Sequence, residues 1–236
     1  MYGGIGHGIG RMMFYPAVSC VLMGSVYLAN QPAWFEKTKG VHSLLSMLLF
    51  SPYLFGSWCS WVYYSRKIPA LSEIVPGILL GRRLNEVEAR RLFNNGNFAV
   101  LDLAPEMAEV VSLRNCNYRH VPILDLAPPS LRQLQEALDF IGLHYHKSRI
   151  YIHCSLGLSR GAAVVAAFLI RQGLNTADAV SLIRRARPQV LVSREHVHIL
   201  KRFEAKPYSC PRESGLNNPP STMHNNVLQT ELRSRK

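Results

Sequence analysis

The central stretch of this 236-residue sequence is His153-Cys154-Ser155-Leu156-Gly157-Leu158-Ser159-Arg160. The run before it, 149–152, is rich in β-branched and aromatic residues, which is typical of a short buried strand. The run after it, 161–170, consists of small and apolar residues and predicts a buried helix that ends before Gly173. The quoted stretch is therefore expected to be a loop from the end of a strand to the start of a helix.

Such a loop is suited to binding an anion. Backbone N–H groups are unpaired at a helix N-terminus, and the helix dipole is positive there. The thiol of Cys154 should ionise easily in this setting. Arg160 adds a planar fork of donors that fits two phosphate oxygens, and Gly157 allows a positive φ and a close approach of the backbone.

The composition favours anionic partners and a reducing compartment. The formal net charge is +12, with Lys and Arg scattered through the sequence. This charge suits a phosphorylated substrate or acidic lipid headgroups, and no motif with interleaved aromatics indicates nucleic acid. The five cysteines are widely spaced and do not predict a disulfide framework or a zinc site. His144-x-His146 and His196-x-His198 lack partner ligands, so we expect neither a metal nor another cofactor.

Two uncharged runs precede the central part of the chain. Residues 12–29 and 41–64 carry no charged side chain, and Arg66-Lys67 follow the second run directly. We interpret 12–64 as two transmembrane helices that form a hairpin, after a flexible segment 1–11. Basic residues after the second helix place the following domain on the cytoplasmic side. A cleaved signal peptide and a pair of buried core helices are the alternatives.

Strands and helices alternate in residues 65–206. Expected strands lie on both sides of Pro76-Gly77, at 98–103, at 118–124 and at 149–152. Expected helices begin after Asn85, Ser130, Thr176 and Ser193, in addition to the helix after the central loop. This pattern predicts an α/β domain with a central, mostly parallel sheet flanked by helices, and a ligand site at the carboxyl ends of the strands. The polar residues 207–236 are expected to be a disordered tail.

The signature His153-Cys154-x5-Arg160 resembles that of the protein tyrosine phosphatase superfamily. The order of the surrounding elements resembles its compact dual-specificity branch over about residues 68–205. Leu80-Gly81, Val121-Pro122-Ile123-Leu124-Asp125 and Arg187-Pro188 extend the match. A membrane hairpin before such a domain resembles membrane-associated bacterial members of this branch, which implies a multi-pass protein of the bacterial inner membrane.

The resemblance implies a role for each residue of the loop. Cys154 would attack phosphorus as a thiolate and form a phosphocysteine, and Arg160 would bind two phosphate oxygens. His153 would order the loop. The remaining phosphate contacts would come from backbone amides of the loop, namely those of Ser155, Leu156, Gly157, Leu158, Ser159 and Arg160. The hydroxyl of Ser159 would either serve the phosphate or cap the helix.

Asp125 is our candidate for the general acid. It follows an apolar strand and precedes a stiff Pro-containing loop, from which a carboxyl group would reach the leaving oxygen. Asp102, also at a strand end, is the rival, although its apolar neighbours favour a structural role that binds loop amides.

The sequence thus predicts a membrane-anchored phosphatase for phosphotyrosine, phosphoserine or phosphothreonine in proteins. Two alternatives remain. A phospholipid headgroup could be the substrate, although the loop lacks the basic residues frequent in inositide-directed members. The domain could also be a phosphate-binding pseudophosphatase with slow turnover, because Gly161 replaces the usual Ser or Thr after the signature Arg.

Overall fold

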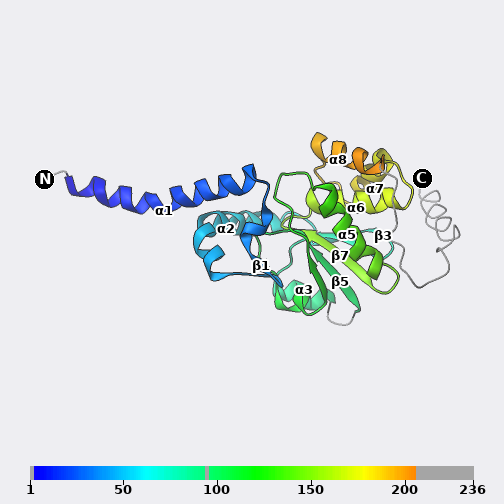
Figure 1. Cartoon of the computed structure of the whole chain (residues 1–236). Coiled ribbons are helices and arrows are strands. Elements are labelled where there is room, and N and C mark those ends of the chain that lie inside the picture. Colours follow the sequence, from blue (N-terminus) through cyan, green and yellow to red (C-terminus); the bar gives the residue numbers. More distant parts are fainter. Residues whose placement is uncertain (1–2, 94–95, 206–236) are drawn as a thin grey trace, which may run out of the picture.

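The computed structural model describes residues 3–93 and 96–205, with side chains from residue 14 onward. The predicted tail 207–236 lies outside the described residues. The described chain contains an N-terminal helical region and an α/β domain that pack against each other (Figure 1).

A five-stranded sheet forms the centre of the α/β domain, in the order β3-β4-β7-β5-β6. Three neighbouring pairs are parallel, and only the edge strand β3 runs antiparallel to its neighbour β4. The prediction of a mostly parallel sheet is therefore confirmed. The strands are β3 Leu71–Val75, β4 Ile78–Arg82, β5 Phe98–Asp102, β6 Asn117–His120 and β7 Arg149–Cys154.

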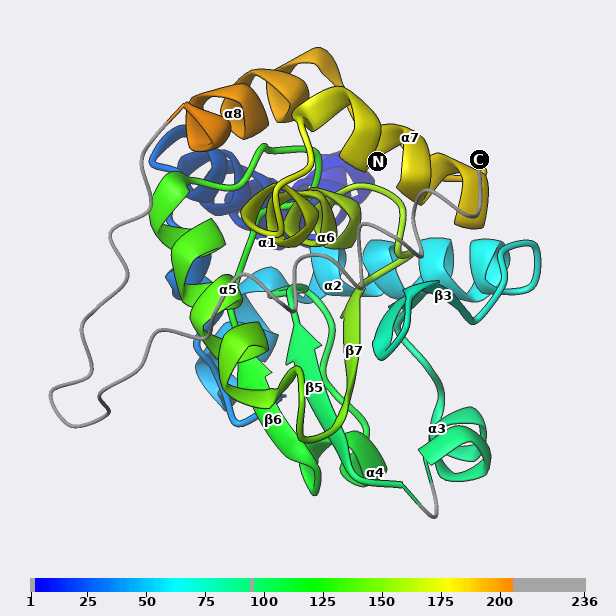
Figure 2. The same cartoon turned by 90° about the vertical axis from the view of Figure 1, so that its right-hand side faces the viewer.

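Helices cover both faces of this sheet (Figures 1 and 2). On one face, α6 packs against β4 and β7 and is surrounded by α5, α7 and α8, where the larger apolar core lies. On the other face, α3 and α4 cover a smaller apolar cluster that includes Phe93 and Tyr151. The helices are α3 Glu86–Phe93, α4 Val111–Arg114, α5 Leu131–His144, α6 Arg160–Arg171, α7 Thr176–Ala186 and α8 Arg194–Glu204.

Side-chain caps fix the starts of most of these helices. Ser130 forms a reciprocal capping box with Gln133, and Ser193 accepts a bond from the amide of His196, as the sequence predicts. Helix α7 differs by one residue, because Asn175 rather than Thr176 is its cap. Strand β6 ends at His120, earlier than predicted, because Pro122 has no N–H for a ladder bond.

The N-terminal region also forms two helices, but the prediction that they cross a membrane is not supported. They are α1 Gly3–Leu28 and α2 Leu44–Ser65, so α1 includes most of the segment expected to be flexible. Within the described residues, neither these helices nor any other combine the length and the apolar character needed for a membrane span. Glycine, serine, tyrosine and proline are uncharged but contribute little hydrophobicity, so the lack of charge in these runs does not make them membrane spans.

A small β-hairpin connects the two helices. It consists of β1 Lys37–Thr38 and β2 Val41–His42, after the short 3-10 helix η1 Pro32–Phe35. The Ser43 side chain caps α2, with a bond from the amide of Ser46.

The N-terminal region packs on the α/β domain near the carboxyl ends of its parallel strands. Phe35 of η1 and Phe50 of α2 belong to one apolar cluster with Leu124, which follows β6. Trp61 of α2 packs against Ala104 and donates a hydrogen bond to the Arg83 carbonyl at 2.9 Å. These contacts place α2 beside the loop that begins at Cys154.

Candidate active site

Cys154 lies at the carboxyl end of β7, where the sequence analysis placed it. The residue is almost completely buried, and the amide of Gly157 donates a hydrogen bond to its sulfur at 3.2 Å. Its carbonyl, together with that of Ser155, accepts a bond from the Arg83 amide. The sulfur therefore lies inside the curve of its own loop, and Cys154 also lines a cavity, described below.

Gly157 is required in this loop by its backbone and by its surroundings. Its φ is +67°, in the left-handed region, and a Cβ atom there would lie 2.3 Å from the Gly81 carbonyl oxygen. Any larger residue would push the signature loop away from β4. The sequence analysis predicted both the conformation and the close approach.

Arg187 forms hydrogen bonds with the backbone of the signature loop, residues 153–160. Its buried guanidinium donates hydrogen bonds to the carbonyls of Gly157 at 3.0 Å and Leu156 at 3.4 Å, and to that of Pro69 at 3.0 Å. Burial lowers the pKa of Arg187 below its usual value. Because Arg187 binds these carbonyls, it holds the backbone of the loop in place around the sulfur.

Arg160 begins helix α6, and its side chain is held by two carboxylates. Glu106 binds the guanidinium with both oxygens, at 2.6 and 2.8 Å, and Asp125 Oδ1 lies 3.1 Å from Arg160 Nη2. Arg160 also donates a bond to the Ile123 carbonyl at 3.1 Å. Burial opposes the charge of this guanidinium, but the neighbouring carboxylate of Glu106 outweighs that effect and keeps its pKa above the usual value.

The two candidate acids lie in different environments. Asp125 is partly exposed, lines the cavity with Cys154 and contacts Arg160. It precedes Leu126, whose φ of +60° is rare for a bulky residue and turns the chain sharply at this point. Asp102 does not line the cavity. It is buried, and its carboxylate accepts bonds from the amide of Ala104 and the hydroxyl of Tyr118.

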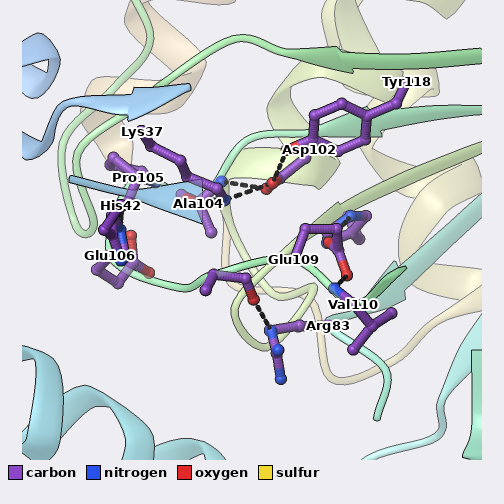
Figure 3. Close-up of polar contacts among 12 residues, drawn as sticks. Lys37, His42, Arg83, Asp102, Ala104, Pro105, Glu106, Glu109, Val110 and Tyr118 are labelled. Atoms are coloured by element: carbon purple, nitrogen blue, oxygen red, sulfur yellow. Dashed lines mark hydrogen bonds and ion pairs between the residues drawn. The ribbon is translucent and has the colours of Figure 1, made fainter. Parts of the chain in front are cut away.

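Asp102 also forms a buried ion pair with Lys37, whose Nζ lies 2.5 Å from Oδ2 (Figure 3). Burial alone would raise the pKa of Asp102, but Lys37 and the nearby ring of His153 more than offset it, so the pKa is well below the usual value. This arrangement agrees with the structural role that the sequence favoured for Asp102.

His153 is buried beside Cys154 and forms an ion pair with Glu109. Its Nε2 lies 3.0 Å from Glu109 Oε2, and its ring stacks on that of Tyr151. Burial alone would lower the pKa of His153, but the carboxylates of Glu109 and Asp102 outweigh burial and raise it. Because the raised pKa favours the imidazolium form and Glu109 pairs with it, His153 is suited to ordering the loop and not to accepting a proton.

Ser159 and Gly161 flank Arg160. Ser159 occupies the cap position of α6, but its side chain forms no capping bond and lines the cavity instead. At Gly161, a Cβ atom would lie 2.6 Å from Leu80 Cδ1. The residue after the signature Arg is therefore close to a core leucine, which helps to explain a glycine at this position.

The cavity above Cys154 has a volume of about 720 Å³. The signature loop and Asp125 form its base, while Val190–Ser193 and His196 form one part of its wall. Another part comes from the N-terminal helices, through Tyr27 of α1 and through Tyr53, Gly56, Ser57 and Ser60 of α2. The site is therefore deeper than the α/β domain alone would make it.

Three buried side chains offer a possible cation site. Ligand atoms of Asp102, Glu109 and His153 all lie within 4.8 Å of one another. However, Lys37 already neutralises Asp102, and His153 already pairs with Glu109. In the described part of the chain, this trio is better explained as a network of buried ion pairs than as a metal centre.

The chain belongs to the family of dual specificity phosphatase catalytic domains, which matches residues 85–206, slightly more than half of the sequence. Among curated proteins, it is 30% identical over 147 residues to dual specificity protein phosphatase 12 of Mus musculus, covering 60% of this chain and 43% of the relative. It is also 30% identical over 149 residues to protein-tyrosine-phosphatase IBR5 of Arabidopsis thaliana, covering 62% and 56% respectively. The chain thus spans about half the length of these relatives.

Solved structures agree with this assignment. The crystal structure of Tk-PTP in its active form matches with a TM-score of 0.53 and 28% identity, covering 58% of this chain and 97% of that chain. PTPMT1, solved in complex with PI(5)P, matches with a TM-score of 0.52, covering 58% of this chain and 95% of that one. Its identity of 21% shows a shared fold only.

Sequence reasoning missed four side chains that hold the signature loop. Glu106 and Glu109 lie in an irregular loop without a hydrophobic period, and Lys37 lies in a segment that we had interpreted as a connection between membrane helices. Arg187 was noted only as part of the resemblance. A local signal was available for Glu106 and Glu109, which are acidic residues following a strand end, but nothing in the sequence identified their partners.

Proposed function

We propose that this protein is a cysteine-dependent phosphatase that hydrolyses phosphomonoesters on phosphorylated protein side chains. The observation that carries this proposal is the placement of Cys154, Arg160 and Asp125 around one cavity, with the sulfur held by the Gly157 amide. The curated relatives are named as protein phosphatases, which favours a phosphorylated protein over the lipid alternative.

The first chemical step in this proposal is transfer of the phosphoryl group to sulfur. The Cys154 thiolate attacks phosphorus, the P–O ester bond breaks, and Asp125 donates its proton to the leaving oxygen. The amides of Ser155 to Arg160 and the Arg160 guanidinium bind the phosphoryl oxygens. The guanidinium is already oriented by Glu106, so little reorganisation is needed when phosphate binds.

The second step is hydrolysis of the phosphocysteine. A water molecule attacks phosphorus, the Asp125 carboxylate accepts its proton, and the S–P bond breaks to release inorganic phosphate and the thiolate. Gly161 offers no hydroxyl to assist the departing sulfur. We therefore expect this step to limit turnover, without abolishing it.

Hydrolysis of 4-nitrophenyl phosphate and of a phosphotyrosine peptide tests the proposal. Wild-type protein should hydrolyse both, Cys154→Ser should lose all activity, and mass spectrometry of quenched wild-type protein should detect a phosphate adduct on Cys154. Cys116→Ser is the matched control, because Cys116 lies outside the cavity. Equal activity in Cys154→Ser and wild type would refute the proposal.

We further propose that the protein associates with the surface of an anionic membrane through α1 and α2. Most of the large apolar side chains that are exposed in the described chain lie on or between these helices, among them Leu28, Leu44 and Leu48. The exposed cations Arg66 and Lys67 directly follow α2, and the net charge of +12 favours acidic headgroups. On the cytoplasmic side of such a membrane, a reducing environment would keep the Cys154 thiol free.

Flotation with vesicles tests this association. The protein should bind vesicles that contain phosphatidylglycerol, and Leu44→Ser/Leu48→Ser should weaken binding. Val87→Ser/Leu143→Ser removes exposed apolar side chains elsewhere on the molecule and should not. Equal binding by the two double variants would contradict the proposed surface.

A further inference from the structure

A buried ion pair connects the N-terminal hairpin to the α/β domain. Lys37 of β1 lies outside residues 85–206, which match the family, yet its Nζ reaches Asp102 at 2.5 Å. Both side chains are 1% exposed. Asp102 is the last residue of β5 and pairs in register with His153 on β7. Lys37 therefore binds a residue that lies beside His153, which directly precedes Cys154. A solvent-exposed connection between helices would not be expected to bury a lysine in this way.

The hairpin also forms hydrogen bonds with the backbone of the loop that follows β5. Lys37 Nζ donates a hydrogen bond to the Ala104 carbonyl at 2.8 Å, and His42 Nε2 lies 2.7 Å from the Pro105 carbonyl. The Glu109 amide donates to the Gly40 carbonyl at 2.7 Å. Burial lowers the pKa of His42, so its ring is neutral at pH 7 and donates through Nε2. Three contacts from one hairpin therefore fix residues 104–109. Figure 3 shows Lys37 and His42 beside Ala104 and Pro105.

Residues 104–109 form no regular secondary structure, so their shape depends on contacts of this kind. The domain itself contributes a bond from Arg83 Nε to the Ala108 carbonyl at 2.6 Å. The domain also binds the Ala104 amide, through Asp102, whereas the bonds to the carbonyls of Ala104 and Pro105 come from the hairpin.

The same loop carries the two carboxylates that hold the signature residues. Glu106 binds both terminal nitrogens of Arg160, and Glu109 pairs with His153 at 3.0 Å. A continuous path of short polar contacts therefore leads from β1 and β2, through residues 104–109, to the side chains on either side of the nucleophile.

We propose that the β1–β2 hairpin sets the geometry of the signature loop, with Lys37 and His42 as positioning residues for Arg160 and His153. The inference rests on the proposed phosphatase function and adds to it a requirement for a segment outside the family domain. A shift of residues 104–109 would move Glu106 and turn the guanidinium away from the transferring phosphoryl group. Because the orientation of the Arg160 guanidinium matters most in the transition state, the variants should lower kcat more than they raise KM.

Steady-state kinetics with 4-nitrophenyl phosphate test this proposal in the full-length protein. Lys37→Met and His42→Ala should each lower kcat/KM about tenfold, mostly through kcat. His42→Gln, whose amide nitrogen replaces Nε2 as a donor, should recover most of the activity. Lys37→Met leaves the buried Asp102 without its cation, which destabilises the fold, so the His42 pair of variants provides the decisive comparison.

Two matched controls separate positioning from general effects. Lys39→Met removes an exposed cation from the same hairpin and should keep wild-type kinetics. Tyr118→Phe removes a hydrogen bond from Asp102 without touching residues 104–109, and should also keep them. If Tyr118→Phe lowers kcat as much as His42→Ala, or if His42→Ala has wild-type kinetics, the proposal is overturned.

The activity of the wild-type protein distinguishes failure of the proposed phosphatase function from failure of the positioning role. If the wild-type protein shows no Cys154-dependent turnover, the phosphatase assignment is refuted. The positioning role is then tested by phosphate binding. In that case, calorimetric titration with inorganic phosphate should show about tenfold weaker binding to His42→Ala than to His42→Gln. Equal affinities would overturn the positioning role.

Discussion

Glu106 binds the guanidinium of Arg160 through both of its oxygens, at 2.6 and 2.8 Å, although the two residues are 54 positions apart. Both side chains are almost completely buried. The pair orients the terminal nitrogens of Arg160 beside the cavity before any phosphate is bound. This relationship leads to the first of four predictions.

Glu106→Gln should lower kcat/KM for an aryl phosphate about tenfold, which corresponds to about 1.4 kcal/mol. Glutamine keeps one acceptor oxygen but loses the charge and the bidentate geometry, so Arg160 would be less well oriented. Kinetics with 4-nitrophenyl phosphate measure the effect. Glu136→Gln on the exposed surface of α5 is the control. An increase in activity would instead mean that Glu106 competes with the substrate for Arg160.

Asp125→Asn should lower kcat/KM for phenyl phosphate about 100-fold at neutral pH, because kcat/KM reports the first step, in which the leaving phenolate then lacks a proton donor. The loss should be smaller for 4-nitrophenyl phosphate, whose leaving group needs less protonation. Asp139→Asn, on α5 and outside the cavity, should behave as wild type. Equal losses for both substrates would argue against a general acid at position 125.

Gly161→Ser should speed the hydrolysis of the phosphocysteine, and a pre-steady-state burst should become less pronounced. The added Cβ would lie 2.6 Å from Leu80 Cδ1, so the single variant should also unfold at a lower temperature. Leu80→Val removes the atom that is contacted, and the double variant should recover part of the stability. Stopped-flow kinetics and thermal unfolding measure the two effects. An unchanged burst would show that the missing hydroxyl does not limit turnover.

The His153–Glu109 pair should make stability depend on pH. The pKa of His153 is raised in the folded state, so its pairing stabilises the fold fully below the unfolded value of about 6.5, and this stabilisation is lost as the pH rises through the folded pKa. Thermal unfolding between pH 5.5 and 9 measures this. The difference between wild type and Glu109→Gln should be largest near pH 6 and should shrink at alkaline pH.

The exposed pair of Glu136 and Arg119 serves as a reference, because arginine does not titrate in this range. Glu136→Gln should therefore show a small difference that stays constant with pH. A constant difference for Glu109→Gln as well would indicate that His153 is neutral in the folded protein.

The sequence by itself determined the α/β domain and the centre of its site. Hydrophobic periodicity and caps such as Ser130 and Ser193 are local signals, and they predicted the sheet and most helices within a few residues. The spacing of Cys154 and Arg160 predicted an anion-binding loop because both residues belong to one strand–loop–helix unit, whose geometry is set locally. The structure brings Asp125 within 3.1 Å of Arg160, and its role as general acid stays a prediction.

Only the tertiary structure decided which charged groups hold this loop. Glu106, Glu109 and Lys37 are far from Arg160 and His153 in the sequence, and charged residues in irregular segments have no periodicity that reveals their partners. The prediction of transmembrane helices in the N-terminal region is unsupported for a related reason. A lack of charged residues is compatible with a helix that spans a membrane and with a helix that packs on another domain. Which of these forms depends on the surface that each helix contacts after folding.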